Sequence, residues 1–302
     1  YDDVKLTDIN LDKVQTIGKY AFYNCELLNN LSMKKIYAIG ANAFENCKSL
    51  SEIDLTTLRN SGKEIFKNCT SLSKVILANN TKLSYAMFVE SGVEEIEIYE
   101  KVEIPAFCFA KCANLEKVIV HNDLVNVGYG AFSECPSLIE ITFNGKVENF
   151  GEQVFYATKN LNKITLPNSE FRLGNYCFYQ CEALEEVVFQ ENTKILENFG
   201  AIFQNTTVSK FTVHEDNPYY EIEDNYLVNE NKNTIIFALP SMEVETLTID
   251  PKYATIGAGA FSGLKIKHLV ITNKDTVIEG YAFANCETLE TITLPLESGL
   301  VI

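Results

Sequence analysis

The sequence predicts a right-handed repeat solenoid, in which similar coils stack with one parallel β-sheet along one side, short helical or 3₁₀ turns opposite, and one inserted β-hairpin. Three observations support this prediction. A phenylalanine recurs at a nearly constant interval, a short alternating hexamer follows it, and an apolar residue, usually with a glycine, precedes it. A period in the low twenties is typical of a solenoid, because one coil cannot bury its apolar face alone.

The recurring phenylalanine lies in an Ala-Phe-x-x-Cys motif. Its interval is 21 to 25 residues as far as Phe203, then 58 residues to Phe261, and 22 more to Phe283. The Ala-Phe segment is too short for a full helix, so we expect one helical or 3₁₀ turn whose phenylalanine fills the core. The motif phenylalanines are Phe22, Phe44, Phe66, Phe88, Phe109, Phe132, Phe155, Phe178, Phe203, Phe261 and Phe283.

A hexamer with apolar first, fourth and sixth positions follows the motif, as in Leu50-Ser-Glu-Ile-Asp-Leu55. Its alternation predicts a short half-buried strand. One such strand per coil, all in the same direction, would form a parallel sheet. In the first half of the coil, an apolar residue and a glycine precede the phenylalanine, as in Ile39-Gly40. Glycine there indicates either a positive φ or a close approach of the neighbouring coil.

The long interval between Phe203 and Phe261 contains a different pattern. The segment Tyr219–Pro240 has two apolar runs around a polar Asn229–Asn233 stretch, which predicts a β-hairpin. We therefore expect one solenoid over residues 1–302 with a hairpin insertion at about 214–243. The chain opens without an initiator methionine and stops just after a strand pattern, so we expect it to be a fragment of a longer array.

The composition argues against several functions. The formal net charge of −16 disfavours nucleic acid and anionic membrane surfaces as partners, since both select basic patches. No apolar run is long enough to insert into a membrane. Nucleotide-binding, zinc-protease and serine-hydrolase motifs are absent, so we expect no enzyme activity, catalytic residue or cofactor. Hydrolysis of surface polymers stays the weakest alternative.

Most cysteines occupy one motif position. Cys108 and Cys177 instead precede a motif phenylalanine, and their spacing from Cys112 and Cys181 would suit a metal site. Zinc needs four converging ligands, however, and the histidines are scattered, so we interpret the cysteines as buried small side chains and expect no metal and no disulfide. The cysteines of the motif position are Cys25, Cys47, Cys69, Cys112, Cys135, Cys181 and Cys286.

The repeated Ile-Gly-x-x-Ala-Phe-x-x-Cys-x-x-Leu-x-x-Ile-x-Leu pattern, from about Val14 to Leu294, resembles the BspA-type (Treponema-type) leucine-rich repeats of bacterial surface antigens. The hairpin segment is similar to inserts in that family. The resemblance implies a leucine-rich-repeat superhelix that is secreted or displayed on the cell surface, with its leader outside this chain. It also implies adhesion to host proteins or other cells. Free thiols in such a protein would be consistent with an anaerobic source organism.

The exposed positions of the predicted strands carry an unexpected pattern. The third position of the hexamer alternates in sign over eight successive coils, and side chains on adjacent strands lie about 4.8 Å apart. Opposite charges would therefore face each other at every step and favour this register. We call this row the charge ladder. Its members are Glu52, Lys74, Glu95, Lys117, Glu140, Lys163, Glu186 and Lys210.

The fifth position of the hexamer is mostly β-branched. This row is either a contact surface for a protein or glycan, or ordinary strand propensity at an exposed position. The first alternative predicts a monomeric adhesion or recognition module, and the second fits a structural spacer that displays another domain. We name the best candidate surface the candidate face. It consists of Lys117, Ile119, Glu140, Thr142, Lys163, Thr165, Glu186 and Val188.

Overall fold

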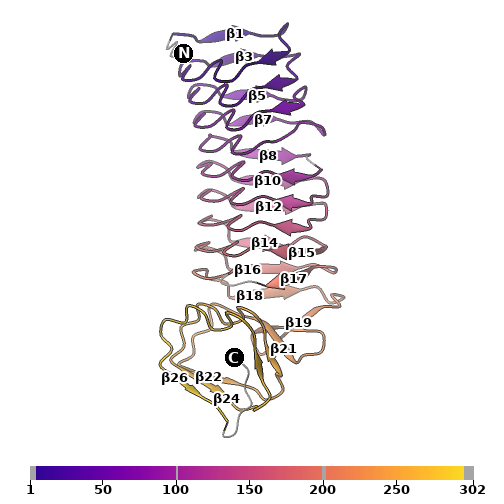
Figure 1. Ribbon diagram of the computed structural model, residues 1–302, viewed down its shortest axis with the longest axis vertical. Coiled ribbons are helices and arrows are strands. Elements are labelled where there is room, and N and C mark those ends of the chain that lie inside the picture. Colours follow the sequence, from indigo (N-terminus) through magenta and orange to yellow (C-terminus); the bar gives the residue numbers. More distant parts are fainter. Residues whose placement is uncertain (1–4, 100, 199–201, 296–302) are drawn as a thin grey trace.

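The computed structural model describes residues 5–99, 101–198 and 202–295. Each coil adds one strand to a main row of parallel strands, and the coils stack into a column (Figure 1). The predicted parallel-strand repeat solenoid is confirmed. No helix in the described ranges could cross a membrane. The main strands are β1 (Asp8–Asn10), β3 (Asn30–Ser32), β5 (Glu52–Asp54), β7 (Lys74–Ile76), β8 (Glu95–Ile98), β10 (Lys117–Val120), β12 (Glu140–Phe143), β14 (Lys163–Thr165), β16 (Glu186–Phe189), β18 (Lys210–Val213), β22 (Thr246–Ile249), β24 (His268–Ile271) and β26 (Thr291–Thr293).

A second row of short parallel strands forms where the apolar residue and glycine precede each motif, so the structure adds a second sheet to the one predicted. The glycine permits a close approach of backbones, and its φ is not positive. A Cβ on Gly62 would lie 2.2 Å from the backbone nitrogen of Ala41 in the preceding coil. The strands of this row are β2 (Thr16–Ile17), β4 (Ala38–Ile39), β6 (Asn60–Ser61), β9 (Glu103–Ile104), β11 (Asn126–Val127), β13 (Asn149–Phe150), β15 (Glu170–Leu173), β17 (Lys194–Asn198), β23 (Thr255–Ile256) and β25 (Val277–Ile278).

The expected helical or 3₁₀ turn around the motif phenylalanine is wrong in its backbone conformation. Asn42 and Asn46 flank Phe44 with φ angles of 56° and 63°, in the left-handed region. The backbone N–H groups of these three residues donate to carbonyl oxygens of the next coil, at 3.0, 2.9 and 3.0 Å for Asn42, Asn46 and Phe44. A helix would direct its N–H groups along its own segment. The bonds between coils offset the strain, which is about 1–2 kcal/mol per left-handed residue.

The phenylalanines form a continuous stack through the core from Phe22 to Phe203. Neighbouring ring centroids lie 5.1 to 5.9 Å apart and the planes differ by no more than 11°. Offset stacking at this spacing is favourable beyond the burial of the rings. The coil repeat thus places one ring per layer at the separation that aromatic pairs prefer.

The cysteines are free thiols, and eight of the nine are buried beside this stack. The Sγ of Cys69 donates to the carbonyl oxygen of Phe44 in the preceding coil at 3.1 Å, and that of Cys135 to Phe109 at 3.0 Å. Burial raises the pKa of Cys112 to about 11. The motif cysteine is therefore a small core side chain, as the sequence indicates, and its weak S–H donor binds the preceding coil.

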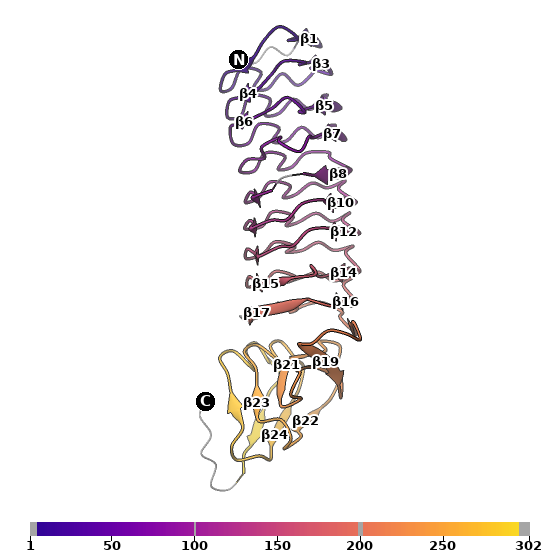
Figure 2. The same cartoon turned by 90° about the vertical axis from the view of Figure 1, so that its right-hand side faces the viewer.

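The predicted hairpin is a three-stranded antiparallel sheet of β19 (Tyr220–Glu223), β20 (Tyr226–Asn229) and β21 (Thr234–Ala238). Strand β21 also pairs in parallel with β23 and so joins the second row. After the insert, the coils stack across the column instead of along it (Figures 1 and 2). That residues 1–302 act as one solenoid domain of a longer protein stays a prediction.

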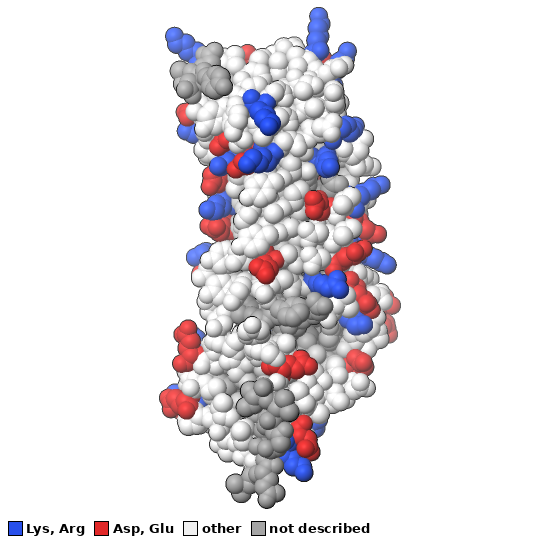
Figure 3. All heavy atoms as spheres, viewed as in Figure 1, with Lys and Arg blue, Asp and Glu red and all other residues white. Residues whose placement is uncertain are grey.

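One side of the column carries charged side chains mainly along its edges. In the view of Figure 3, Lys, Arg, Asp and Glu side chains gather along the two edges of the column, and few lie on the face between them. Charges of both signs are intermixed on each edge, so neither edge presents a field of one sign.

Candidate functional site

The candidate face lies on four main strands, β10, β12, β14 and β16. In the pair β10–β12, Lys117 faces Glu140 and Ile119 faces Thr142. In the pair β14–β16, Lys163 faces Glu186, and Thr165 faces Val188. The structure thus brings the eight residues together as two groups of four. Among the residues described, no backbone pairing joins β12 to β14, although the two strands lie next to each other in the column.

The charge ladder has the predicted register. Opposite members face each other on paired strands, and four ion pairs form along it. Their nitrogen–oxygen distances are 3.4 Å for Lys74–Glu52, 3.5 Å for Lys117–Glu140, and 2.9 Å for both Lys163–Glu186 and Lys210–Glu186. Each exposed pair contributes only a few tenths of a kcal/mol, so the ladder mainly specifies register and keeps this surface locally neutral.

Glu186 is the most constrained member of the ladder. The Thr212 hydroxyl donates to its carboxylate at 2.6 Å, and Lys210 and Lys163 bind it from the two neighbouring strands. These contacts, led by the Thr212 hydrogen bond, lower the pKa of Glu186 to about 2. Because its oxygens are already occupied, Glu186 connects three strands and is a poor ligand group.

The β-branched row of the candidate face is only partly exposed. Ile119, Thr142, Thr165 and Val188 are half-buried between their neighbours, and the alternate positions of the same strands are buried in the core. Their side chains therefore form a low, flat strip. Such a strip offers shape complementarity to a flat partner surface.

A second feature of the same sheet was not predicted from the sequence. The rings of Tyr99 and His121 stack at 4.5 Å with planes 5° apart. The Tyr99 hydroxyl donates to Glu97 at 2.6 Å, and His121 Nε2 lies 3.0 Å from the same oxygen. These hydrogen bonds, that from Tyr99 first, lower the pKa of Glu97. The sequence could have indicated this pair, because Tyr99 and His121 occupy the same position in successive coils.

A shallow groove adjoins this aromatic pair. Strands β7 and β8 pair only at Lys74 and Glu95, and beyond that point they leave a hollow of about 550 Å³. Ile76, Leu77 and Tyr99 line it, and Ile76 is 41% exposed. The apolar part of the sheet face thus extends towards the N-terminus beyond the predicted residues.

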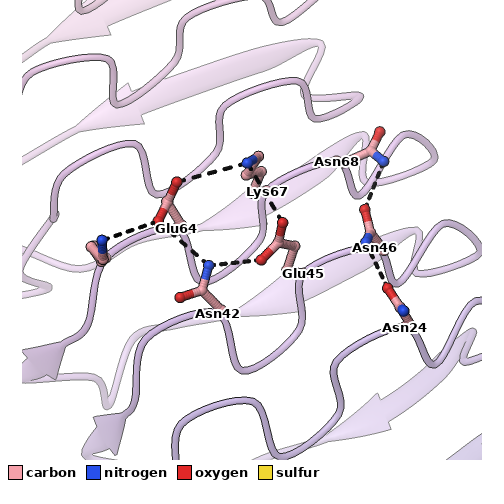
Figure 4. Close-up of polar contacts among 8 residues, drawn as sticks. Asn24, Asn42, Glu45, Asn46, Glu64, Lys67 and Asn68 are labelled. Atoms are coloured by element: carbon pink, nitrogen blue, oxygen red, sulfur yellow. Dashed lines mark hydrogen bonds and ion pairs between the residues drawn. The ribbon is translucent and has the colours of Figure 1, made fainter. Parts of the chain in front are cut away.

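On the turn side of the column, polar side chains of neighbouring coils bond to one another (Figure 4). Asn68 donates to Asn46 at 2.7 Å, and Asn46 donates to Asn24 at 2.6 Å, so one amide per coil links three layers. Beside them, Glu45 and Glu64 bind Lys67; burial opposes its charge, but the two carboxylates raise its pKa. These polar groups therefore hold neighbouring coils together. Within the described ranges, no group of three or more His, Cys, Asp or Glu side chains could hold a metal ion.

Comparison with known proteins identifies the family. The profile of the BspA type leucine rich repeat region matches residues 1–104, 102–234 and 236–299, with six copies. The chain belongs to this family. None of the curated proteins compared with it matches. The family is one of repeat proteins, and the absence of enzyme activity in this chain stays a prediction.

Several solved bacterial structures are similar to this chain. A leucine-rich repeat protein from Bacteroides ovatus is 20% identical, with a TM-score of 0.57 over 99% of this chain and 74% of that one. A leucine-rich repeat protein from Eubacterium ventriosum is 22% identical, with a TM-score of 0.55 over 69% of this chain and 61% of that one. A leucine rich cell surface protein from Faecalibacterium prausnitzii is 18% identical, with a TM-score of 0.44 over 97% of this chain and 74% of that one. The chain thus corresponds to 61% of the Eubacterium protein's length.

Proposed function

We propose that the chain is a non-enzymatic recognition module of a secreted or cell-surface protein, and that it binds a protein partner through the main sheet. The observation behind the proposal is the flat, half-exposed β-branched row bordered by a charge ladder whose members neutralise each other. The family and the cell-surface description of the Faecalibacterium protein are consistent with this location.

The physical properties of the face suit a protein partner. β-Branched side chains lose little rotamer freedom on contact, so ordering them costs less than ordering long flexible side chains. Tyr99, stacked on His121 beside the half-exposed Ile76, supplies the kind of rigid aromatic anchor that dominates many interfaces. Because the ladder is locally neutral, binding should depend only weakly on ionic strength.

The test is a double substitution on the candidate face, Ile119→Asp with Val188→Asp, assayed against extracellular-matrix proteins and host cells. Two buried carboxylates at an interface should weaken binding by about tenfold or more. Val277→Asp, at a 46% exposed position on β25 of the second row, is the matched control and should leave binding unchanged. Retained binding by the double variant, with thermal unfolding unaltered, would move the site off the candidate face.

The second candidate function is a structural spacer. It is favoured by the internal use of charges, since Glu186 and its lysines are engaged with each other and not presented to a ligand. A spacer predicts that the unaltered chain binds none of the extracellular proteins or cells, and that the same face can be substituted without loss of adhesion by the full-length protein.

A further inference from the structure

A second surface of the molecule has the construction of a binding site and lies apart from the candidate face. It is a groove of about 650 Å³ where the chain passes from the main sheet to the second row of strands. We call it the edge groove and define it by residues 123–125, 146–148 and 168–170 together with Asn192 and Tyr219. In Figure 3, intermixed positive and negative side chains follow the right-hand edge, at the carboxyl ends of the main strands. Its volume is in the range of small-ligand sites.

The walls of the edge groove are held by the backbone. Asp123 Oδ1 accepts a hydrogen bond from the backbone N–H of Lys146 at 2.7 Å, and Asn168 Oδ1 accepts one from that of Asn192, also at 2.7 Å. Buried Ser169 bonds to the backbone of Val147 as donor and acceptor. Polar side chains from successive coils are thus fixed in rows before any ligand arrives, which lowers the entropic cost of binding.

The insert closes one end of the edge groove. Tyr219 donates its hydroxyl to Glu170 at 3.2 Å, and Lys194 lies 4.5 Å above the Tyr219 ring while pairing with Glu170 at 3.2 Å. The coil array and the hairpin segment, which are remote in sequence, therefore build this wall together. The arrangement fixes an aromatic ring at the end of a polar groove.

The chemistry of the edge groove fits a sugar chain better than a protein surface. Glu148 offers a carboxylate acceptor and Asn192 an amide, while the 50% exposed Val125 gives one small apolar contact. Lys101 and Lys146 nearly balance the acidic lining residues, so no strong field selects a charged ligand. The coils repeat at about 4.8 Å, close to the length that one sugar unit adds to an extended β-linked chain.

We propose that the edge groove binds a neutral oligosaccharide containing N-acetylated hexosamine units. Hydroxyl groups of successive sugars would bond to the carboxylate of Glu148 and to the side-chain amide of Asn192. An acetamido methyl would pack on Val125, and the Tyr219 ring would contact the sugar at the closed end. This site is independent of the protein-binding role proposed for the candidate face.

The test compares two oligosaccharides with the same linkage, chitohexaose with its N-acetyl groups and cellohexaose without them, by calorimetric titration of the whole chain. Chitohexaose should bind at least about tenfold more tightly, because cellohexaose lacks the acetamido contacts. Changing the salt from low to physiological concentration should alter the affinity by less than about twofold. Failure of both sugars to bind would overturn the proposal.

Variants locate the site. Glu148→Ala and Tyr219→Ala should each weaken chitohexaose binding by about tenfold, since each removes a contact in the groove. Tyr219→Phe keeps the ring and its Lys194 contact, and should retain most of the binding even if Tyr219→Ala disturbs the fold. Glu116→Ala, an exposed carboxylate outside the groove, is the matched control and should have no effect.

The result also separates this proposal from the proposed protein-binding function. The Ile119→Asp, Val188→Asp double variant should bind chitohexaose normally while losing the protein partner. Sugar binding that disappears in this variant but survives Glu148→Ala would place the sugar on the candidate face and overturn the edge-groove site. Loss of protein binding in Glu148→Ala, with no sugar bound by the unaltered chain, would make the groove a protein contact and equally overturn it.

Discussion

The coils before and after the insert repeat the same motif, but they stack in different directions and bury separate cores. Before the insert, the rings from Phe22 to Phe203 form one continuous stack within one hydrophobic cluster. After it, Phe261 and Phe283 stack on each other at 5.2 Å as a separate pair. The same repeat therefore determines the single coil in both regions, but it does not determine how the two stacks meet.

The insert explains the difference because its strands are apolar on both faces. Leu227 and Phe237 pack into the first core, whereas Val228 and Ile235 pack into the second. The Phe237 ring meets Phe203 edge-on at 75°, so the parallel stack ends there. A non-repeated segment with two apolar faces can thus join two arrays at an angle that neither array specifies.

The largest expected effect is on stability, and it compares the long phenylalanine stack before the insert with the pair of rings after it. Phe132→Ala, in the middle of the first stack, should lower the free energy of unfolding by about 3–5 kcal/mol through cavity formation. Phe283→Ala removes a ring that is only partly buried, and should cost about 1–2 kcal/mol. Urea unfolding followed by circular dichroism would measure both. Equal losses of unfolding free energy would show that Phe283 is as well buried as Phe132.

The next largest effect concerns the glycines that allow neighbouring coils to approach closely. Gly62→Ala places a Cβ 2.2 Å from the Ala41 backbone nitrogen, and the required shift should cost about 1–3 kcal/mol. Gly280, in the coils after the insert, has no atom within 4 Å of such a Cβ. Gly280→Ala should therefore be neutral or stabilise the chain by up to about 1 kcal/mol. Matched thermal melts would give the ranking, and a stable Gly62→Ala variant would contradict the close approach.

The smallest effect concerns the charge ladder and pH. The folded state holds the pKa of Glu186 at about 2, below the usual value of 4.5, so its contribution to stability is present above pH 5 and is lost as the pH falls towards 2. Its side chain is 20% exposed, so the contribution should be at most about 1 kcal/mol.

Glu186→Gln should consequently lower stability at pH 7 and have little effect near pH 2. Glu245→Gln, which removes the carboxylate that pairs with Lys267 after the insert, should show a weaker trend in the same direction, because Lys267 lowers the pKa of Glu245. Unfolding midpoints recorded from pH 2 to pH 7 would test the pair. A pH-independent difference between Glu186→Gln and the unaltered chain would rule out this role.

Local patterns in the sequence were enough to predict each coil. The recurring phenylalanine indicated the core position, the hexamer indicated the main strand, and the alternating charges indicated the register of adjacent strands. These predictions succeeded because side-chain alternation and repeat length act within one coil or between neighbours. The hairpin segment was also visible from its two apolar runs.

Stacking decided what the sequence pattern left open. Non-glycine residues such as Phe107 adopt left-handed φ angles because their N–H groups can bond to the next coil, which no single coil reveals. The same stacking determines that glycine before the motif serves close approach and not a positive φ. The Ala-Phe turn was therefore predicted wrongly from its own length.

The sequence by itself determined the coil, the identity of its core residues and the sign pattern of its exposed row, because these depend on periodicities that short segments contain. Only the tertiary structure decided the missing backbone pairing between β12 and β14, the change in stacking direction at the insert, and the edge groove. There Tyr219 bonds to Glu170, 49 residues away. Such contacts depend on how a non-repeated segment packs against the array. In that packing each apolar face of the insert is buried in a different core, and no local sequence pattern specifies this arrangement.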